Sequence, residues 1–275
     1  MTLLEALVLG VVQGLTEFLP ISSTAHVRIV PELFGWKDPG AAFTAVIQLG
    51  TLLAVFLFFR NEIGRIFVGW IRGLRGGDTA KSIEARFGWA VFYGTIPIVV
   101  FGILLKEQIE REFRSLYVIA WTLIGLAILL AFAEWVARHT RKLDTVKPLD
   151  GWIVGLFQAL ALVPGVSRSG STITGSLFLG FERSDAAKFS FILSFPAILL
   201  AGLFEIYDQR ERLFEVGVGN IFLSTLAAFI VGYASIAFLL HFLRRHTTWI
   251  FIVYRILLGI VLIALLQRGI LAPLP

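Results

Sequence analysis

Two short stretches of this sequence gather side chains that could act on a phosphate group. The first, residues 13–26, contains an acid, hydroxyl groups and an imidazole, and its candidates are Gln13, Glu17, Ser22, Ser23, Thr24 and His26. The second, residues 158–172, contains an arginine among hydroxyl groups, and its candidates are Ser167, Arg168, Ser169 and Thr172. We expect the two stretches to meet and form one phosphate site.

The first stretch combines residue types that serve acid–base and nucleophilic chemistry. Gln13 and Glu17 are four residues apart, so they share one face of a helix. His26 follows Ser23 by three residues, which places it one turn away on the same face if a helix starts near Ser22. That geometry suits a histidine that orients or deprotonates a serine, or one that contacts a phosphate. The alternative is a histidine that is hydrogen-bonded for structural reasons.

The second stretch has the features of an anion site. Ser167 is placed to cap a helix whose first turn carries Arg168, with Thr172 four residues further on. Free N–H groups at a helix start, hydroxyl groups and a guanidinium group together attract an anion, and the planar guanidinium can bind two phosphate oxygens at once. The alternative is that Pro164, Gly165 and the serines merely end one helix and cap the next, which leaves Arg168 unexplained.

The composition identifies an integral membrane protein. Of the 275 residues, 57% are hydrophobic and 16% are charged, and the mean hydropathy is +0.84. The apolar segments run about 20 residues, the length that crosses a bilayer as a helix, so we expect an all-α fold and not a β-barrel. The net charge of +5 lies at helix ends and reports topology, not a nucleic-acid partner. The lack of cysteine excludes disulfides, thiolate metal sites and a cysteine nucleophile.

Proline and polar residues break the apolar segments at two places. Residues 3–18 and 22–34 are each too short to cross a membrane, and Pro20 and Ser22 interrupt them, so we expect a re-entrant helix pair. A second pair is expected at 151–163 and 167–180. Three segments long enough to cross follow each pair, at 41–59, 87–105 and 116–137, and at 185–204, 218–243 and 249–267. Residues 60–86 are expected to form a loop with at most a short surface helix.

The two halves of the chain resemble each other. A shift of 145 residues aligns Gly10 with Gly155, Gln13 with Gln158 and Ser22 with Ser167. Three crossings is an odd number, so the second half must enter the membrane in the opposite orientation, as in inverted-repeat membrane proteins. We therefore expect one membrane domain made of two repeats, about 1–147 and 148–275. The alternative is that chance matches among apolar residues imitate a repeat.

The charge of the connections predicts the orientation in the membrane. The connections at 60–86, 138–147, 180–188 and 244–245 carry fourteen Lys and Arg residues, and the regions expected on the other side carry eight. Basic residues favour the cytoplasmic side, so we expect both termini outside. No Lys or Arg precedes Arg28, so the first apolar segment is expected to stay in the mature protein.

Ionisable groups inside apolar segments are functional candidates, because each is costly unless it meets a partner or water. For Glu17 the alternative is a carboxylate near a helix end that reaches the lipid headgroups. Arg255 and Glu134 lie near the ends of predicted crossings, and we expect both to reach the headgroups and to stay outside the site. Glu205, at the outer end of its span, is also left outside the site.

The sequence resembles a known family at the motifs that carry these candidates. At Gln13-Gly-Leu-Thr-Glu17, Ser22-Ser-Thr-Ala-His26 and Pro164-Gly-Val-Ser-Arg-Ser-Gly-Ser-Thr172 it is similar to the bacterial undecaprenyl-diphosphate phosphatases, known as bacitracin resistance proteins. The resemblance covers essentially the full length. Ala25 stands where members often have glycine, a small change that we expect to be tolerated. Thr174 stands where the acid-phosphatase-like membrane phosphatases would need a histidine.

The resemblance implies a reaction, a cofactor and a location. The reaction is hydrolysis of undecaprenyl diphosphate to undecaprenyl phosphate and inorganic phosphate, which recycles the lipid carrier of cell-wall synthesis. The cofactor is a divalent cation, Mg²⁺ or Ca²⁺, for which Glu17 and Gln13 are the candidate ligands, since oxygen atoms suit hard cations. The location is the bacterial inner membrane, among membrane lipids. The leaflet that feeds the site is left open, and so is the choice between a monomer and a homodimer.

The candidate residues then take roles in phosphoryl transfer. We hypothesise that Ser23 attacks the phosphate, with Glu17 as base or metal ligand and Gln13 supporting it. His26 serves as acid or base, and the phosphate is held by Arg168 with the hydroxyl groups of Ser22, Thr24, Ser167, Ser169 and Thr172. Direct attack by a water that Glu17 activates is the leading variant. A polyprenyl-phosphate flippase or an anion transporter is the alternative function, because transporters also build anion sites between inverted repeats.

Overall fold

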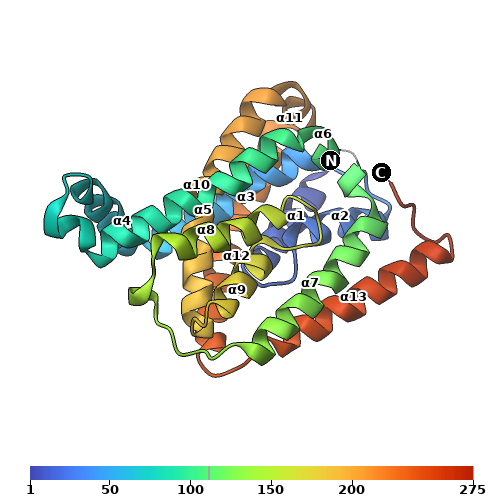
Figure 1. The fold of residues 1–275 in the computed structure, drawn as a ribbon. Coiled ribbons are helices and arrows are strands. Elements are labelled where there is room, and N and C mark those ends of the chain that lie inside the picture. Colours follow the sequence, from blue (N-terminus) through green and yellow to red (C-terminus); the bar gives the residue numbers. More distant parts are fainter. Residues whose placement is uncertain (111, 275) are drawn as a thin grey trace.

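The fold is a bundle of long and short helices (Figure 1). The computed structural model describes residues 1–110 and 112–274. Six of its helices are long and apolar enough to cross a membrane, namely α3 (Gly40–Phe58), α5 (Ile83–Leu104), α7 (Leu116–Val136), α10 (Arg183–Asp208), α12 (Val218–Leu243) and α13 (Trp249–Gln267). They coincide with the six predicted crossings, and the described residues form no regular strand. The prediction of an all-α, multi-pass membrane protein is confirmed.

Four shorter helices form the two predicted pairs. These helices are α1 (Leu3–Thr16), α2 (Ser23–Phe34), α8 (Pro148–Leu160) and α9 (Arg168–Phe178). Their lengths of 14, 12, 13 and 11 residues correspond to about 17 to 21 Å, which is less than the roughly 30 Å of a hydrocarbon core. Each pair is separated by a non-helical break, at residues 17–22 in the first pair and 161–167 in the second. The breaks are where the two polar stretches lie.

The connection after α3 is more helical than the sequence indicated. The structure has α4 (Arg60–Gly73) and the short 3₁₀ helix η1 (Gly77–Lys81), and α5 starts at Ile83 instead of residue 87. The early start is fixed by Ser82, whose Oγ accepts a hydrogen bond from the N–H of Ala85 at 3.2 Å. Charged residues in this first turn interrupt the apolar pattern that marks a membrane helix. The remaining short helices are α6 (Lys106–Glu110), η2 (Glu112–Arg114), η3 (Leu143–Thr145) and α11 (Arg210–Val216).

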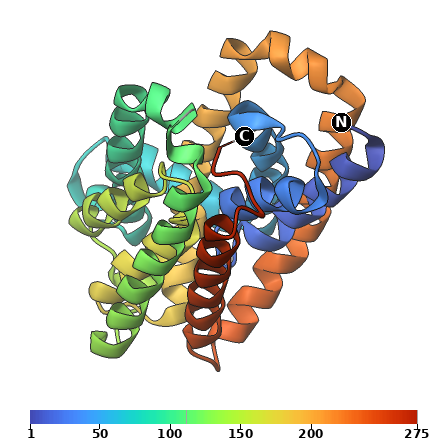
Figure 2. The same cartoon turned by 90° about the vertical axis from the view of Figure 1, so that its right-hand side faces the viewer.

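The main helix contacts join one half of the chain to the other. Helix α1 packs along α12, α8 along α5, α3 along α10, and α7 along α13. The α7 and α13 pair is seen side by side in Figure 2. A Cβ atom at Gly10 would lie 2.3 Å from the carbonyl oxygen of Ser224 on α12, and one at Gly155 would lie 2.5 Å from the backbone of Gly94 on α5. Gly10 and Gly155, which the 145-residue shift aligns, thus each permit close contact between a short helix and a membrane-spanning one. The inversion of the two halves stays a prediction.

The two ends of the bundle carry different segments. Figure 1 shows both chain termini close to α6 and α11, at the end of the molecule away from α4. Figure 1 thus separates α4 from the termini, α6 and α11, while the orientation in the membrane stays a prediction. Between the two ends, Phe18 beside the first break contacts Phe191 of α10 with ring centroids 5.0 Å apart, so the core surrounds the breaks.

Candidate active site

Both breaks end in a serine with the same unusual conformation. Ser22 has φ 75° and Ser167 has φ 72°, and each is the N-cap of the helix that follows, α2 and α9. The Oγ of Ser22 accepts from the N–H of Ala25 at 3.3 Å, and the Oγ of Ser167 accepts from the N–H of Gly170 at 3.1 Å. A positive φ outside glycine costs about 1 to 3 kcal/mol and is concentrated at functional sites. The sequence correctly indicated where both helices start.

The carboxylate of Glu17 joins the two breaks. Its Oε2 accepts hydrogen bonds from Ser23 Oγ at 2.5 Å and from Gln13 Nε2 at 2.6 Å. Its Oε1 pairs with the guanidinium group of Arg168 from the second break. Ser23 and Arg168 are 145 residues apart in the sequence, yet they bind the two oxygens of one side chain.

This cluster is removed from solvent. Gln13 is fully buried, and Glu17 and Ser23 are only 5% and 7% exposed. A buried carboxylate is costly unless hydrogen bonds and an opposite charge compensate it. Here Arg168 supplies the charge, and Ser23 and Gln13 supply the hydrogen bonds. The expectation that Glu17 reaches a partner and not the headgroups agrees with its position.

Most of the remaining candidate hydroxyl groups lie at the two breaks, and one, that of Thr172, is bonded elsewhere. Ser169 Oγ donates to the carbonyl of Leu19 at 3.1 Å and thereby ties α9 to the first break. Its Oγ also lies 3.2 Å from Ser167 Oγ, and Ser22 Oγ lies at the same distance from Thr24 Oγ1. Thr172 is turned elsewhere, because its hydroxyl bonds to the carbonyl of Arg168 and, at 2.6 Å, to Ser190 of α10.

His26 is held by partners other than Ser23. Its Nδ1 lies 2.7 Å from the carbonyl oxygen of Ser22, and its Nε2 lies 2.6 Å from the hydroxyl of Tyr254 on α13. The carbonyl can only accept, so Nδ1 carries the proton and Nε2 accepts from the tyrosine hydroxyl. Of the roles considered for His26, orienting Ser23 is therefore not observed. Glu17 does that instead, and Tyr254 is a neighbour that no sequence pattern indicated.

Arg255 lies inside the site, and the expectation that it reaches the headgroups was wrong. Its side chain is fully buried. It donates to the carbonyl of Pro20 at 3.0 Å in the first break and to the carbonyls of Gly165 and Val166 at 2.9 and 3.0 Å in the second. Broken helices leave carbonyl groups without intrahelical partners, and here one guanidinium group satisfies carbonyls of both breaks.

Glu134 also differs from its expected position, although it is not part of this site. It is 6% exposed, and it accepts from Arg183 Nε at 2.6 Å and from Thr248 Oγ1 at 2.9 Å. These bonds join the end of α7 to the starts of α10 and α13. A carboxylate that bonds two neighbouring helices does not need the headgroups.

The donor atoms of the cluster fit a divalent cation only in part. Gln13 Oε1 is buried without a hydrogen-bond partner, and Glu17 is the single carboxylate beside it. Residues 1–110 and 112–274 contain no group of three or more His, Cys, Asp or Glu side chains that could hold a metal alone. Mg²⁺ commonly binds through one or two protein oxygens together with substrate phosphates, and the cluster fits that mode.

The fold and the cluster together define a multi-pass membrane protein with a buried polar cluster between its helices. The profile of the family described as bacitracin resistance protein BacA matches residues 6–261. The chain belongs to this family.

Three relatives illustrate the similarity, and each carries the name undecaprenyl-diphosphatase. The protein of Myxococcus xanthus (strain DK1622) is 53% identical, with 100% of this chain and 92% of the relative aligned. That of Chlorobium phaeovibrioides is 54% identical over 99% of this chain and 100% of the relative. That of Chlorobaculum tepidum is 51% identical over the same shares.

Arg255 provides a test of how the breaks are held. In Arg255→Leu the carbonyls of Pro20, Gly165 and Val166 lose their donor, and each buried unpaired group costs about 1 to 3 kcal/mol. We expect the melting temperature in detergent to fall and amide hydrogen exchange to rise at residues 17–22 and 161–167. Arg268→Leu removes the same charge from the exposed end of α13 and should melt like the wild type. Equal melting of both variants would contradict the role of Arg255.

Proposed function

We propose that this protein is an undecaprenyl-diphosphatase, which hydrolyses undecaprenyl diphosphate to undecaprenyl phosphate and inorganic phosphate and thereby recycles the lipid carrier of cell-wall synthesis. Family membership and the names of the relatives support the reaction. The structural observation that supports it best is the single carboxylate shared by Ser23 and Arg168. These contacts bring together the side chains that we assign as nucleophile, base and anion-binding group.

Ser23 is the proposed nucleophile and Glu17 its base. The short contact of Ser23 Oγ with Glu17 Oε2 aligns the hydroxyl proton with the carboxylate. In the first step the Oγ–P bond forms at the terminal phosphate, the bond from that phosphorus to the bridging oxygen breaks, and the serine proton passes to Glu17. Water then hydrolyses the phosphoserine and releases inorganic phosphate. In the variant without a covalent intermediate, Glu17 deprotonates the attacking water directly.

Arg168 and the start of α9 are the proposed phosphate grip. When the substrate binds, Arg168 gives up its contact with the Glu17 carboxylate. Its planar guanidinium group then binds the oxygens of the terminal phosphate. The other proposed phosphate-binding groups are hydroxyls beside the same two breaks, namely those of Ser22, Thr24, Ser167 and Ser169. His26, once its Nε2 is released by the Tyr254 hydroxyl and has taken up a proton from water, donates to the phosphate or serves as acid for the leaving oxygen.

A divalent cation, Mg²⁺ or Ca²⁺, is the proposed cofactor. Gln13 Oε1 and Glu17 would hold it together with diphosphate oxygens of the substrate. When bound, it neutralises charge on the diphosphate. The amide of Gln13 meanwhile keeps Glu17 in place through its Nε2.

The expected setting is the inner membrane of a bacterium with both termini outside. The charge of the connections supports this orientation. A homodimer stays an untested prediction. The alternative of a flippase or anion transporter draws no support from the names of the relatives.

The proposed activity can be tested directly with the purified protein. We expect release of inorganic phosphate from undecaprenyl diphosphate in detergent, and loss of this release when divalent cations are chelated. The control is the movement of labelled lipid across vesicles that contain the protein. Lipid movement without phosphate release would contradict the phosphatase and favour a transporter.

The serine mechanism predicts a specific loss. Ser23→Ala removes the nucleophile, and we expect turnover to fall by about two orders of magnitude or more. The wild type, quenched in acid during turnover, should carry a phosphate on Ser23 that mass spectrometry detects. Ser115→Ala, which alters a serine without a side-chain cap bond at the start of α7, should keep full activity. Full activity in Ser23→Ala would contradict attack by Ser23 and favour direct attack by a water molecule.

Arg168→Lys separates charge from geometry at the phosphate grip. Lysine keeps the positive charge beside Glu17 but lacks the planar fork, so we expect turnover to fall by about tenfold or more. The melting temperature should stay near that of the wild type, in contrast to Arg255→Leu. Near wild-type turnover would remove Arg168 from the proposed site.

A further inference from the structure

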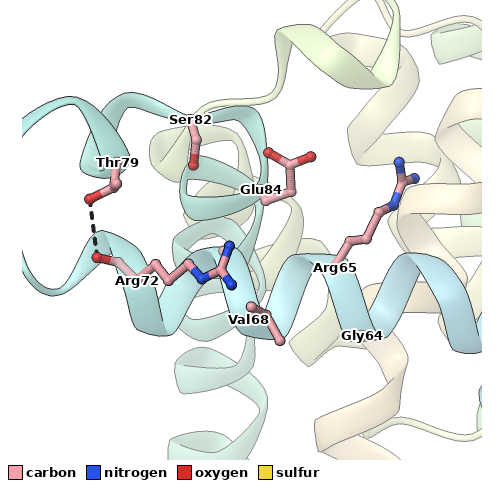
Figure 3. A pocket seen from close by; sticks show the side chains of 8 residues that line it. Gly64, Arg65, Val68, Arg72, Thr79, Ser82 and Glu84 are labelled. Atoms are coloured by element: carbon pink, nitrogen blue, oxygen red, sulfur yellow. Dashed lines mark hydrogen bonds between the residues drawn. The ribbon is translucent and has the colours of Figure 1, made fainter.

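A pocket with charged residues in its walls lies at the opposite side of the molecule from the termini, where α4 meets the start of α5 (Figure 3). It has a volume of about 520 Å³ and no residue in common with the Glu17 cluster. Its walls come from α4, from η1 and from the start of α5, and the residues used below are Gly64, Arg65, Val68, Arg72, Thr79 and Glu84. We call it the α4 pocket.

Helix α4 lies at the depth of the lipid headgroups. Phe59 ends α3, a membrane-spanning helix, and is also the N-cap of α4, so α4 starts where the hydrocarbon ends. Trp70 of α4 contacts two rings of α5, edge-on to Trp89 with ring centroids 5.6 Å apart and stacked on Phe92 at 5.8 Å. Tyr93 adds to this cluster at 5.4 Å from Trp89. Trp and Tyr gather at the interface between hydrocarbon and water, which places the α4 pocket beside the headgroups.

The outer surface of α4 is apolar and unpartnered within the described residues. Gly73 is the only residue of α4 that is buried, at the contact with α5. Large apolar side chains are about half exposed on the rest of the helix, namely Phe67, Val68, Ile71 and Leu74. A short helix with an exposed apolar face and arginines beside it is the pattern of an element that lies in a membrane surface.

The pocket combines positive charge with hydrogen-bonding groups. Arg65 and Arg72 are seven residues apart on α4, which brings both to the same face of the helix. Figure 3 shows one hydrogen bond among the lining residues, from Thr79 Oγ1 to the carbonyl of Arg72, so neither guanidinium group is bonded to Glu84 across the pocket. Arg65 does interact with the charge of Glu62. Residues 60–86 as a whole carry six basic and three acidic side chains.

We propose that the α4 pocket binds the headgroup of an anionic phospholipid from the surrounding leaflet. The phosphodiester lies between Arg65 and Arg72, and headgroup hydroxyls, as in phosphatidylglycerol, donate to the carboxylate of Glu84. The acyl chains follow Val68 and Ile71 out of the pocket. This apolar continuation distinguishes a lipid from a free phosphate ion, and the carboxylate of Glu84 disfavours a dianionic phosphate. The inference is independent of the proposed phosphatase activity.

The test measures lipid retention and not catalysis. The purified full-length protein is equilibrated with mixed micelles of phosphatidylglycerol and phosphatidylcholine, and native mass spectrometry counts the lipids that remain bound. We expect the wild type to retain phosphatidylglycerol preferentially, and Arg65→Gln/Arg72→Gln to lose this preference by about tenfold or more. Arg75→Gln/Lys81→Gln removes two charges from the same connection outside the pocket and should retain the lipid.

A second variant fills the pocket without changing its charge. A Cβ atom at Gly64, which lines the pocket, meets no atom within 4 Å, so Gly64→Leu has room at its Cβ, is expected to extend into the pocket and favours the helix. It should also abolish the preference for phosphatidylglycerol, with an unchanged melting temperature. Equal loss in both double variants would show diffuse attraction and overturn the site. Displacement of the lipid by a large excess of inorganic phosphate alone would overturn the choice of a lipid as ligand.

Discussion

A buried carboxylate that must be neutralised by groups from both halves of the chain governs this structure. Glu17 is almost fully buried, so water contributes little to solvating its charge, and the arginine that compensates it belongs to the other pair of short helices. The two breaks must therefore meet. Their meeting requires α1 to pack against α12 and α8 against α5, since these contacts set how deep each short pair enters the bundle.

A second constraint acts on the backbone of the breaks. Interrupted helices expose carbonyl groups that an apolar medium cannot satisfy. Arg255 meets this requirement by binding carbonyls from both breaks with one side chain, while Ser22 and Ser167 turn the chain sharply into the next helix. One arginine thus bonds to the backbone, whereas Arg168 pairs with the carboxylate of Glu17, which our proposed mechanism has it exchange for phosphate. The two arginines differ in role because their acceptors differ.

Much of this arrangement could be read from the sequence. The six crossings follow from apolar length, and the breaks follow from Pro20 and Ser22 in the first half and from Pro164 and Ser167 in the second. The roles of Arg255, Glu134 and Tyr254 could not be predicted, because each depends on a contact with residues more than 45 positions away. Because Arg255 and Glu134 lie near helix ends, we expected both side chains to reach the lipid headgroups. Their burial depends instead on which face of each helix contacts a neighbouring helix. Helix α4 was underestimated because its charged first turn and its glycines conceal an amphipathic pattern.

The contact of His26 with Tyr254 carries a consequence for which molecules reach the site. The tyrosine ring belongs to a membrane-spanning helix and is 41% exposed on its outer surface, while its hydroxyl touches the imidazole. The Tyr254 side chain thus lies between His26 and the outer surface of the helix bundle. A diphosphate attached to a long hydrocarbon tail is concentrated in the bilayer and would reach Tyr254 by diffusion in two dimensions. Water-soluble diphosphates, including nucleotides, do not partition into that phase, so a route past Tyr254 would favour lipid-linked diphosphates without a pocket shaped to reject the others.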